Sequence, residues 1–178
     1  MSKQSTVTLR QAPVEGSSAT SGSLLVRADS LAVQTRERIE LVDLTDRLTT
    51  FVADAAVRDG VLSVWSLHTT CAIFVNEAQH ALHADIKRAL EQIIHRDTDW
   101  MHNDPDQSDC DRGNADAHLR AMLLGHSLTL QVSGGEIVLG QWQRVLAAEL
   151  DGPRLRTIRL QILGIATGGA QPFRVAIP

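Results

Sequence analysis

The sequence predicts a single α+β domain in which antiparallel β-sheets carry a few helices packed on one side. Short stretches in which every second residue is apolar recur along the chain, and most are joined by tight turns. Segments with helical periodicity gather in the middle of the chain and do not alternate with the strands, which argues against parallel βαβ units. A length of 178 residues, of which 43% are hydrophobic, is enough for one core.

The domain is expected to begin with two strands and a helix. One strand covers residues 24–34, either continuous or broken at Asp29 and Ser30, and the next covers residues 37–42. The Asp59-Gly60 pair is expected to end the helix that follows. Asp43 or Thr45 can cap this helix, because the next apolar residues recur at helical spacing: Leu44, Leu48, Phe51, Val52 and Ala55.

The central part predicts two strands, two helices and a long loop. Strands are expected over residues 61–67 and 71–75, and the second is so apolar that both of its faces should be covered. Residues 96–113 form a polar, acidic loop of a length that is usually functional or disordered. A short helix over residues 114–124 should end at Gly125. The other helix is indicated by a stripe of Leu82, Ile86, Ala89, Leu90 and Ile93.

The last part reads as strands and turns, with a tail at each end of the chain. Strands are expected over residues 127–132, 137–139 and 142–149, with turns at 133–136 and 151–154. In the final strand Ile158, Leu160 and Ile162 share one face. We expect a flexible tail over residues 1–23, the domain over 24–165 and a second tail over 166–178.

Composition excludes several classes of protein. A net charge of -4 without a basic block gives no reason to expect nucleic acid or an anionic membrane surface as a partner. No apolar run reaches the ~20 residues that span a bilayer, and no apolar stretch follows Lys3 as in a secretory signal. Cys71 and Cys110 without an export signal do not indicate a disulfide framework. We therefore expect a cytoplasmic location.

Three of the seven histidines have neighbouring residues that favour a role in binding or catalysis. His68 follows a strand and precedes Thr69 and Thr70, so it can be a ligand, an acid or a base beside an anionic substrate. The alternative is a strand-end histidine satisfied by a backbone carbonyl. His102 lies in the acidic loop, and His118 shares a helix face with Asn114. Imidazoles brought together suit a divalent metal such as zinc, although no ligand motif fixes the set.

A second group of polar residues lies around the strand over residues 142–149. Trp142 and Gln143 can stack on a flat ring and read its edge, or belong to the core. Glu149, Asp151 and Arg154 cluster at a tight turn, where a local ion pair is the alternative. Phosphate-loop and dinucleotide fingerprints are absent, so no nucleotide cofactor is expected.

Together these pieces resemble the YjbQ-like family. The matching blocks are Ser66-Leu67-His68-Thr69-Thr70, Asn76-Glu77, His102, Asn114-Ala115-Asp116-Ala117-His118, Gly140-Gln141-Trp142-Gln143 and Glu149-Leu150-Asp151-Gly152-Pro153-Arg154. The resemblance covers residues 24–164. The chain departs from the family pattern at Gln141, at Cys71, in lacking an Asp-Pro between Ala78 and Asp85, and in a long loop at 104–113.

The resemblance implies a homotrimer that joins hydroxymethylpyrimidine diphosphate to thiazole phosphate, with release of pyrophosphate, as an activity that can be secondary. The alternatives are a trimeric protein that binds a metal or a phosphorylated metabolite, and a metal-dependent hydrolase. The implied metal is zinc or magnesium, held by His68, His102 and His118. His68, Thr69 and Glu149 are the implied catalytic residues. The implied contacts to the phosphorylated substrate are Asn76, Glu77, Asn114, Trp142, Gln143, Asp151 and Arg154.

Overall fold

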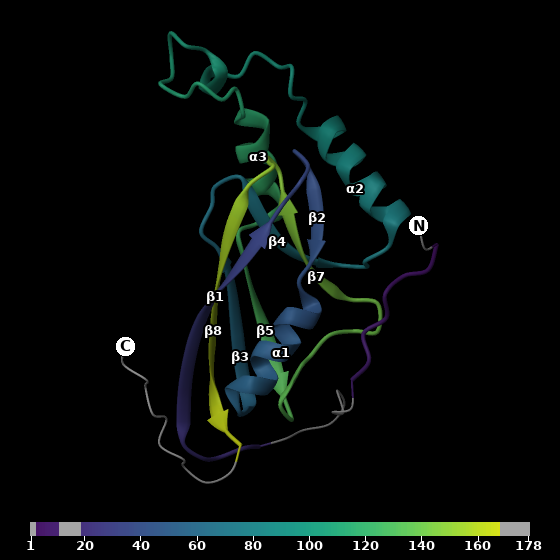
Figure 1. Cartoon of the computed structure of the whole chain (residues 1–178), viewed down its shortest axis with the longest axis vertical. Coiled ribbons are helices and arrows are strands. Elements are labelled where there is room, and N and C mark those ends of the chain that lie inside the picture. Colours follow the sequence, from purple (N-terminus) through teal and green to yellow (C-terminus); the bar gives the residue numbers. More distant parts are fainter. Residues whose placement is uncertain (1–2, 11–18, 168–178) are drawn as a thin grey trace.

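The computed structural model describes residues 3–10 and 19–167, which form two antiparallel sheets and three α-helices (Figure 1). This confirms the predicted α+β class. The five-stranded sheet has the spatial order β1 (Leu24–Gln34), β8 (Leu155–Ala166), β3 (Val57–Ser66), β5 (Ser127–Ser133) and β6 (Glu136–Ile137). The three-stranded sheet has the order β2 (Glu40–Asp43), β7 (Arg144–Glu149) and β4 (Cys71–Asn76). The helices are α1 (Thr45–Ala55), α2 (His80–Ile93) and α3 (Ala115–Leu124), with a 3-10 turn η1 (Met101–Asn103).

The three-stranded sheet lies between two apolar clusters. Its Cys71, Ile73, Val145 and Ala147 pack with α1 and with the inner face of the five-stranded sheet. Its Ala72, Phe74 and Ala148 pack with Leu90 of α2 and Ala117 of α3. Every residue of β7 is buried, and so are the first three residues of β4, which confirms the expectation for the apolar strand.

The outer face of the five-stranded sheet is open to solvent. The described helices pack against the inner face of this sheet or against the three-stranded sheet. On the outer face Val26, Trp65 and Leu163 are 56%, 54% and 39% exposed. In the described part of the chain this is therefore a sheet with one covered and one uncovered face.

The first helix ends earlier than expected, so the prediction for Asp59 and Gly60 was wrong. Helix α1 stops at Ala55, and Ala56 has a left-handed backbone with φ 54°. Asp59 and Gly60 lie within β3, after a bulge that begins at Val57. A Cβ at Gly60 would sit 2.3 Å from the carbonyl oxygen of Leu163, so glycine is needed for the close approach of β3 to β8.

Most other boundaries follow the predictions within a few residues. β1 is continuous and pairs with β8 from Leu24 to Gln34. The N-cap residue of α1 is Leu44, so the prediction that Asp43 or Thr45 caps this helix was wrong. The Asp43 carboxylate accepts a hydrogen bond from the Thr45 N–H at 2.8 Å, one residue outside the cap. The strand expected from Trp142 begins at Arg144, because Gln143 folds back and accepts a hydrogen bond from the Gly140 N–H.

The described part of the amino-terminal tail lies along the loops that flank β4 and β7. The Thr6 N–H donates to the Ala78 carbonyl at 3.1 Å, and the Thr8 N–H donates to the Gln141 carbonyl at 2.7 Å. The predictions for residues 11–18 and 168–178 lie outside the described residues, and the mobility of the tails stays a prediction. Among the described helices none is long and apolar enough to cross a membrane. Both cysteines are free thiols.

Candidate functional site

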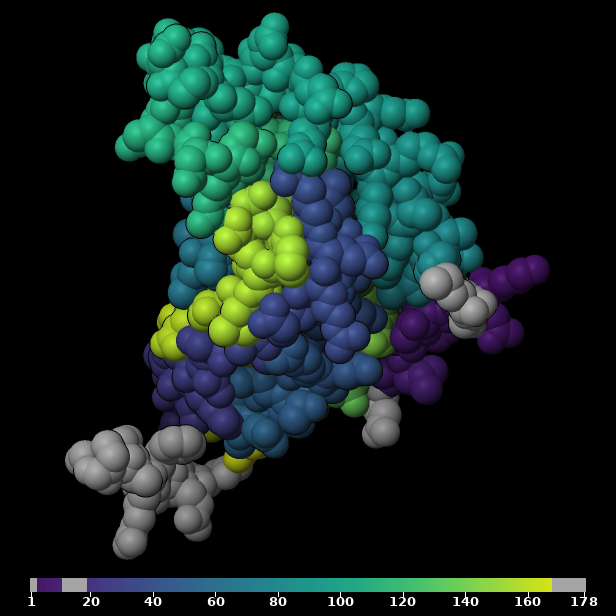
Figure 2. Space-filling view, turned by 45° about the horizontal axis from the view of Figure 1, so that its top comes forward, coloured from purple at the N-terminus to yellow at the C-terminus, as the bar shows by residue number. Residues whose placement is uncertain are grey.

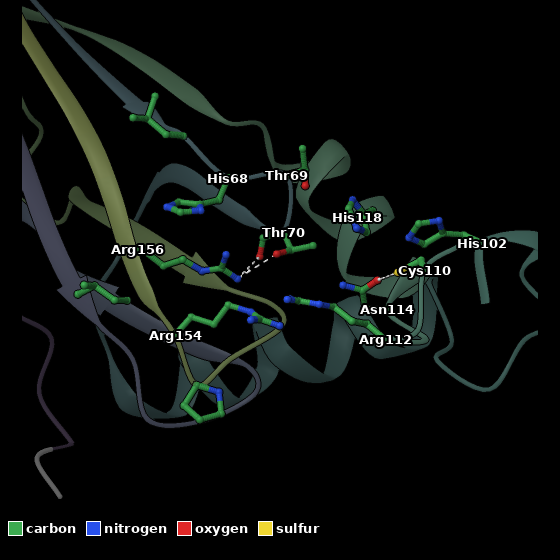
Figure 3. A pocket seen from close by; sticks show the side chains of 13 residues that line it. His68, Thr69, Thr70, His102, Cys110, Arg112, Asn114, His118, Arg154 and Arg156 are labelled. Carbon is green, nitrogen blue, oxygen red and sulfur yellow. Dashed lines mark hydrogen bonds between the residues drawn. The ribbon is translucent and has the colours of Figure 1, made fainter. Parts of the chain in front are cut away.

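A cavity of about 790 Å³ opens where one end of both sheets meets α3. In Figure 2 the segment leading from α2 to α3 lies directly above the turn between β7 and β8, close to this end. Figure 3 shows that side chains from the β3–β4 connection, the long loop, α3 and the start of β8 converge there. The lining residues are Leu67, His68, Thr69, Thr70, His102, Cys110, Arg112, Asn114, His118, Pro153, Arg154, Leu155 and Arg156.

His68 is held in a defined protonation state by β8. Its Nε2 accepts a hydrogen bond from the Thr157 N–H at 2.8 Å, which requires a neutral ring with the proton on Nδ1. Burial lowers the pKa of His68, and the nearby Arg156 guanidinium lowers it further. His68 therefore enters the cavity as a neutral group whose Nδ1–H can donate.

His102 and His118 form an edge-to-face pair. Their ring centroids are 4.9 Å apart and the ring planes make an angle of 79°. The Nε2 atom of His102 is buried and has no hydrogen-bond partner. Burial lowers the pKa of His118, and His102 adds to that effect. The pair thus combines a neutral base with an unsatisfied polar atom, which in a folded protein calls for a partner.

A buried ion pair fixes Arg156 in the cavity wall. Glu149 is 1% exposed, and its Oε2 accepts hydrogen bonds from Arg156 Nε at 2.6 Å and Thr35 Oγ1 at 3.0 Å. The same guanidinium donates to Thr70 Oγ1 at 2.9 Å. Glu149 itself does not line the cavity. The structure therefore places this predicted catalytic residue behind the site, where it holds Arg156.

Asp151 gathers three arginines at the turn between β7 and β8. Its carboxylate lies 2.8 Å from Arg154, 3.3 Å from Arg38 and 3.8 Å from Arg112. It also accepts a hydrogen bond from Asn114 Nδ2 at 2.9 Å. Burial acts to raise the pKa of Asp151, but the hydrogen bonds from Asn114 and Arg154 outweigh it and hold the pKa below its ordinary value. Asp151 is therefore an ionised hub.

The network continues into α3 and gives the site its charge. Asp116 is fully buried and lies 3.0 Å from both Arg38 and Arg120. Arg120 also donates to the Ile94 carbonyl at 2.7 Å, which ties α3 to the end of α2. Five guanidinium groups in this network face the three carboxylates of Glu149, Asp151 and Asp116. The excess of two positive charges lies in a chain whose net charge is -4, so the site is a local attractor for anions.

The predicted site residues divide between two ends of the three-stranded sheet. His68, Thr69, His102, Asn114, His118 and Arg154 line the cavity, with Glu149 and Asp151 behind them. Asn76, Glu77, Trp142 and Gln143 lie at the other end, because Cys71 pairs with Glu149 and Asn76 pairs with Arg144. Within one chain these four residues do not contribute to the cavity.

Thr70 lines the cavity beside Thr69, as expected, whereas the sequence analysis did not single out Cys110, Arg112 and Arg156 as site residues. For Arg156 a signal was present, since it shares the inward parity of Ile158, Leu160 and Ile162 in the last strand. A charged residue at such a position needs a buried partner, and Glu149 supplies it. Cys110 and Arg112 belong to an irregular loop that carries no periodic signal.

The predicted set of three metal ligands is not assembled within the chain. The described residues contain no group of three or more His, Cys, Asp or Glu side chains that could hold a metal ion. His102 and His118 meet, whereas the Nε2 of His68 is engaged by Thr157. The orphaned Nε2 of His102 and the neutral His118 fit two positions of a zinc site, and the described chain does not supply the rest.

Comparisons with known proteins agree on one family. The family model described as "UPF0047 protein YjbQ-like" matches residues 29–165. A UPF0047 protein of Methanothermobacter thermautotrophicus is 42% identical over 139 residues, which cover 78% of this chain and 93% of the relative. The UPF0047 protein YugU of Bacillus subtilis is 30% identical and is covered over 98% of its length.

Solved structures show the same fold. The crystal structure of a YbjQ-like protein of unknown function from Sulfolobus solfataricus matches with a TM-score of 0.74 and 35% identity, over 80% of this chain and 99% of that one. A hypothetical protein from Aeropyrum pernix matches with a TM-score of 0.71 and 36% identity, over 78% of this chain and 98% of that one.

Proposed function

The chain belongs to the YjbQ-like UPF0047 family, and from that premise we propose that it is a cytoplasmic transferase that joins hydroxymethylpyrimidine diphosphate to thiazole phosphate. The observation that carries this proposal is the convergence of three arginines and three histidines on one cavity. A diphosphate needs concentrated positive charge together with directed hydrogen-bond donors, and guanidinium groups supply both.

In the proposed reaction the carbon–oxygen bond between the pyrimidine methylene and the diphosphate breaks. Its electron pair leaves with the diphosphate, and the lone pair of the thiazole nitrogen forms the new carbon–nitrogen bond. Arg112 and Arg154 are the arginines suited to hold the diphosphate, because their side chains are 53% and 32% exposed. Figure 3 shows these two side chains extending toward one another. Donors aimed at the departing oxygen lower the barrier because negative charge develops there.

The histidines supply the proton chemistry. A diphosphate beside His118 favours its protonated form, which reverses the effect that burial has on the pKa of this residue in the free protein. His118 can then donate a proton to the leaving diphosphate, with His102 as its neighbour. His68 Nδ1–H and Thr69 are further donors at the cavity wall. Glu149 and Asp151 act as positioning residues through Arg156 and Arg154.

The test is turnover of the two thiamine halves by the purified protein, followed by release of pyrophosphate. We expect formation of thiamine phosphate, and an about ten- to hundredfold lower rate for Arg154→Gln, because one charge-assisted contact to the leaving group is lost. Binding of the diphosphate without turnover would favour a phosphometabolite-binding protein. Hydrolysis of phosphate esters without condensation would favour the hydrolase.

A divalent metal, zinc or magnesium, remains part of this proposal in a narrower form. His102 and His118 would hold it in place of the proton on His118, and the metal would then supply the positive charge to the diphosphate as a Lewis acid. Elemental analysis of the purified protein and of His118→Ala measures this directly. Metal that stays bound in His118→Ala would exclude this ligand pair.

We also propose a homotrimer, and the outer face of the five-stranded sheet is the surface that favours it. The exposed side chains of this face are largely uncharged, with Arg159 as the charged residue at its centre. Interfaces are depleted in charge and enriched in aromatic side chains such as Trp65, which is 54% exposed. Leu67 and Leu155 border both this face and the cavity, so a partner there would also close the site.

The trimer is tested by light scattering after size-exclusion chromatography. We expect a mass near three chains for the wild type and a smaller mass for Trp65→Glu, because a buried interface charge is costly. The matched control is Trp142→Glu, which changes a tryptophan of similar exposure on the other side of the fold. A monomeric wild type would rule the trimer out.

A further inference from the structure

A second, smaller cavity shares the histidine pair with the larger one, which we call the arginine cavity. It has a volume of about 370 Å³ and is lined by Trp100, Met101, His102, Ala115, His118 and Leu119. His102 and His118 line both cavities, so the two cavities meet at these two rings. Volumes of this size are in the range of small-molecule sites.

The smaller cavity is built by the fold and is not a chance gap in a loop. Trp100 is anchored by a hydrogen bond from its Nε1 to the His95 carbonyl at 2.9 Å. Asn103 accepts a hydrogen bond from the Ala115 N–H at 3.0 Å, which ties the loop to the first turn of α3. These two anchors hold the loop beside α3, with the cavity between their side chains.

The lining chemistry of the two cavities is opposite. The larger cavity carries three guanidinium groups, two threonines and an asparagine. In the smaller cavity every lining side chain except the two imidazoles is apolar. An apolar group placed there would lose water without leaving a polar group of its own unsatisfied.

We propose that the smaller cavity binds the apolar group of a phosphate or diphosphate ester whose anionic end lies in the arginine cavity. This inference rests on the proposed function, because it needs the arginine cavity to hold a phosphate. It names a substrate class: an ester whose organic group is an apolar ring or short hydrocarbon. Hydroxymethylpyrimidine carries an amino group and ring nitrogens that the smaller cavity can meet only through His102 and His118. The thiamine reaction is then a secondary activity of a site that prefers more apolar esters.

The test compares benzyl diphosphate with methyl diphosphate by titration calorimetry on the full chain. Both ligands carry the same charge, so the arginine cavity contributes equally to their binding. We expect benzyl diphosphate to bind at least about tenfold more tightly, because each buried carbon adds a factor of about four. In Leu119→Gln this preference is lost while the affinity for methyl diphosphate is kept, which also shows that the variant is folded.

The matched control is Met122→Gln, which removes an apolar side chain from the same helix. Met122 is 69% exposed and does not line the cavity, so this variant keeps the preference for the benzyl ester. Equal affinity of the two esters for the wild type would overturn the inference and leave the proposed function standing. Failure of both esters to bind would overturn the two together.

Discussion

Both ends of the three-stranded sheet carry clusters of arginine–carboxylate ion pairs, but the two clusters have opposite net charge. At one end Arg144 is buried against two carboxylates, those of Asp43 and Asp46, at 2.7 Å each. At the other end Asp151 is buried against three guanidinium groups. The first arrangement leaves one negative charge, and water can solvate it because Asp46 is 88% exposed. The second leaves positive charge beside a cavity, where a ligand can neutralise it. The ratio of charges in such a cluster therefore separates a structural network from a binding site.

The largest expected effect comes from removing the carboxylate that holds Arg156. Glu149→Gln leaves a buried guanidinium without its counter-charge and should lower the free energy of unfolding by about 3–5 kcal/mol. Glu77→Gln is the same change at the opposite end, at a partly buried position, and should cost less than about 1 kcal/mol. Urea denaturation of the two variants measures both values. Equal losses of unfolding free energy in the two variants would contradict the view that Glu149 holds a buried charge and Glu77 does not.

A pair of arginine variants should separate binding from stability. Arg154→Gln is expected to weaken pyrophosphate binding by about ten- to a hundredfold with little change in stability, because its side chain is one-third exposed. Arg144→Gln should leave the affinity unchanged and lower the melting temperature, because this side chain is buried. Calorimetric titration and thermal unfolding read out the two quantities. A loss of affinity in Arg144→Gln would contradict the assignment of the Arg144 end as purely structural.

The smallest effects concern pH, and they distinguish the histidines at the two ends. The pKa values of His68, His118 and His83 are lowered, in each case mainly by burial. Near about pH 6 the unfolded chain therefore binds protons that the folded chain does not, so stability rises with pH. Lowering the pH from about 7.5 to about 5.5 should reduce the free energy of unfolding, by at most about 1.4 kcal/mol per pH unit for each histidine.

Anion binding should have the opposite pH dependence. Sulfate keeps its charge over this range, so its affinity reports the protein alone. Because a bound anion favours protonated His118, sulfate affinity should rise as the pH falls. His118→Gln should abolish this rise. His83→Gln should keep it while flattening the pH dependence of unfolding. A flat sulfate profile in the wild type would remove His118 from the site.

The sequence predicted the elements that periodicity defines and missed the contacts that only tertiary structure creates. The β4 run Cys71-Ala72-Ile73 could be predicted because a strand covered on both faces is continuously apolar. The buried face of α1 could be predicted because its apolar residues recur at helical spacing. The prediction that Asp59 and Gly60 end α1 was wrong because the same residue types also occur at a β-bulge where two backbones come close. Of the three histidines expected to meet, His102 and His118 are in contact, whereas the Nε2 of His68 is bonded to the backbone of β8. The sequence could not predict that Trp142 lies at the opposite end of the sheet from this histidine pair, because that depends on the antiparallel register of β4 and β7.

Strand β7 is packed on both sides, which separates the part of the site that is fixed by the core from the part that can be redesigned. Of the two carboxylates that hold the arginines, Glu149 is the last residue of the fully buried strand β7 and Asp151 lies in the turn after it. Trp100, Met101 and His102 belong instead to a surface loop. Exchange of Trp100 and Met101 alone for the residues of a relative would thus change the surface proposed to meet the organic half of the ligand, and would leave His102 and Arg112 in place. The proposed phosphate contacts of Arg112, Arg154 and Arg156 would be kept, so the two halves of specificity could be tuned separately.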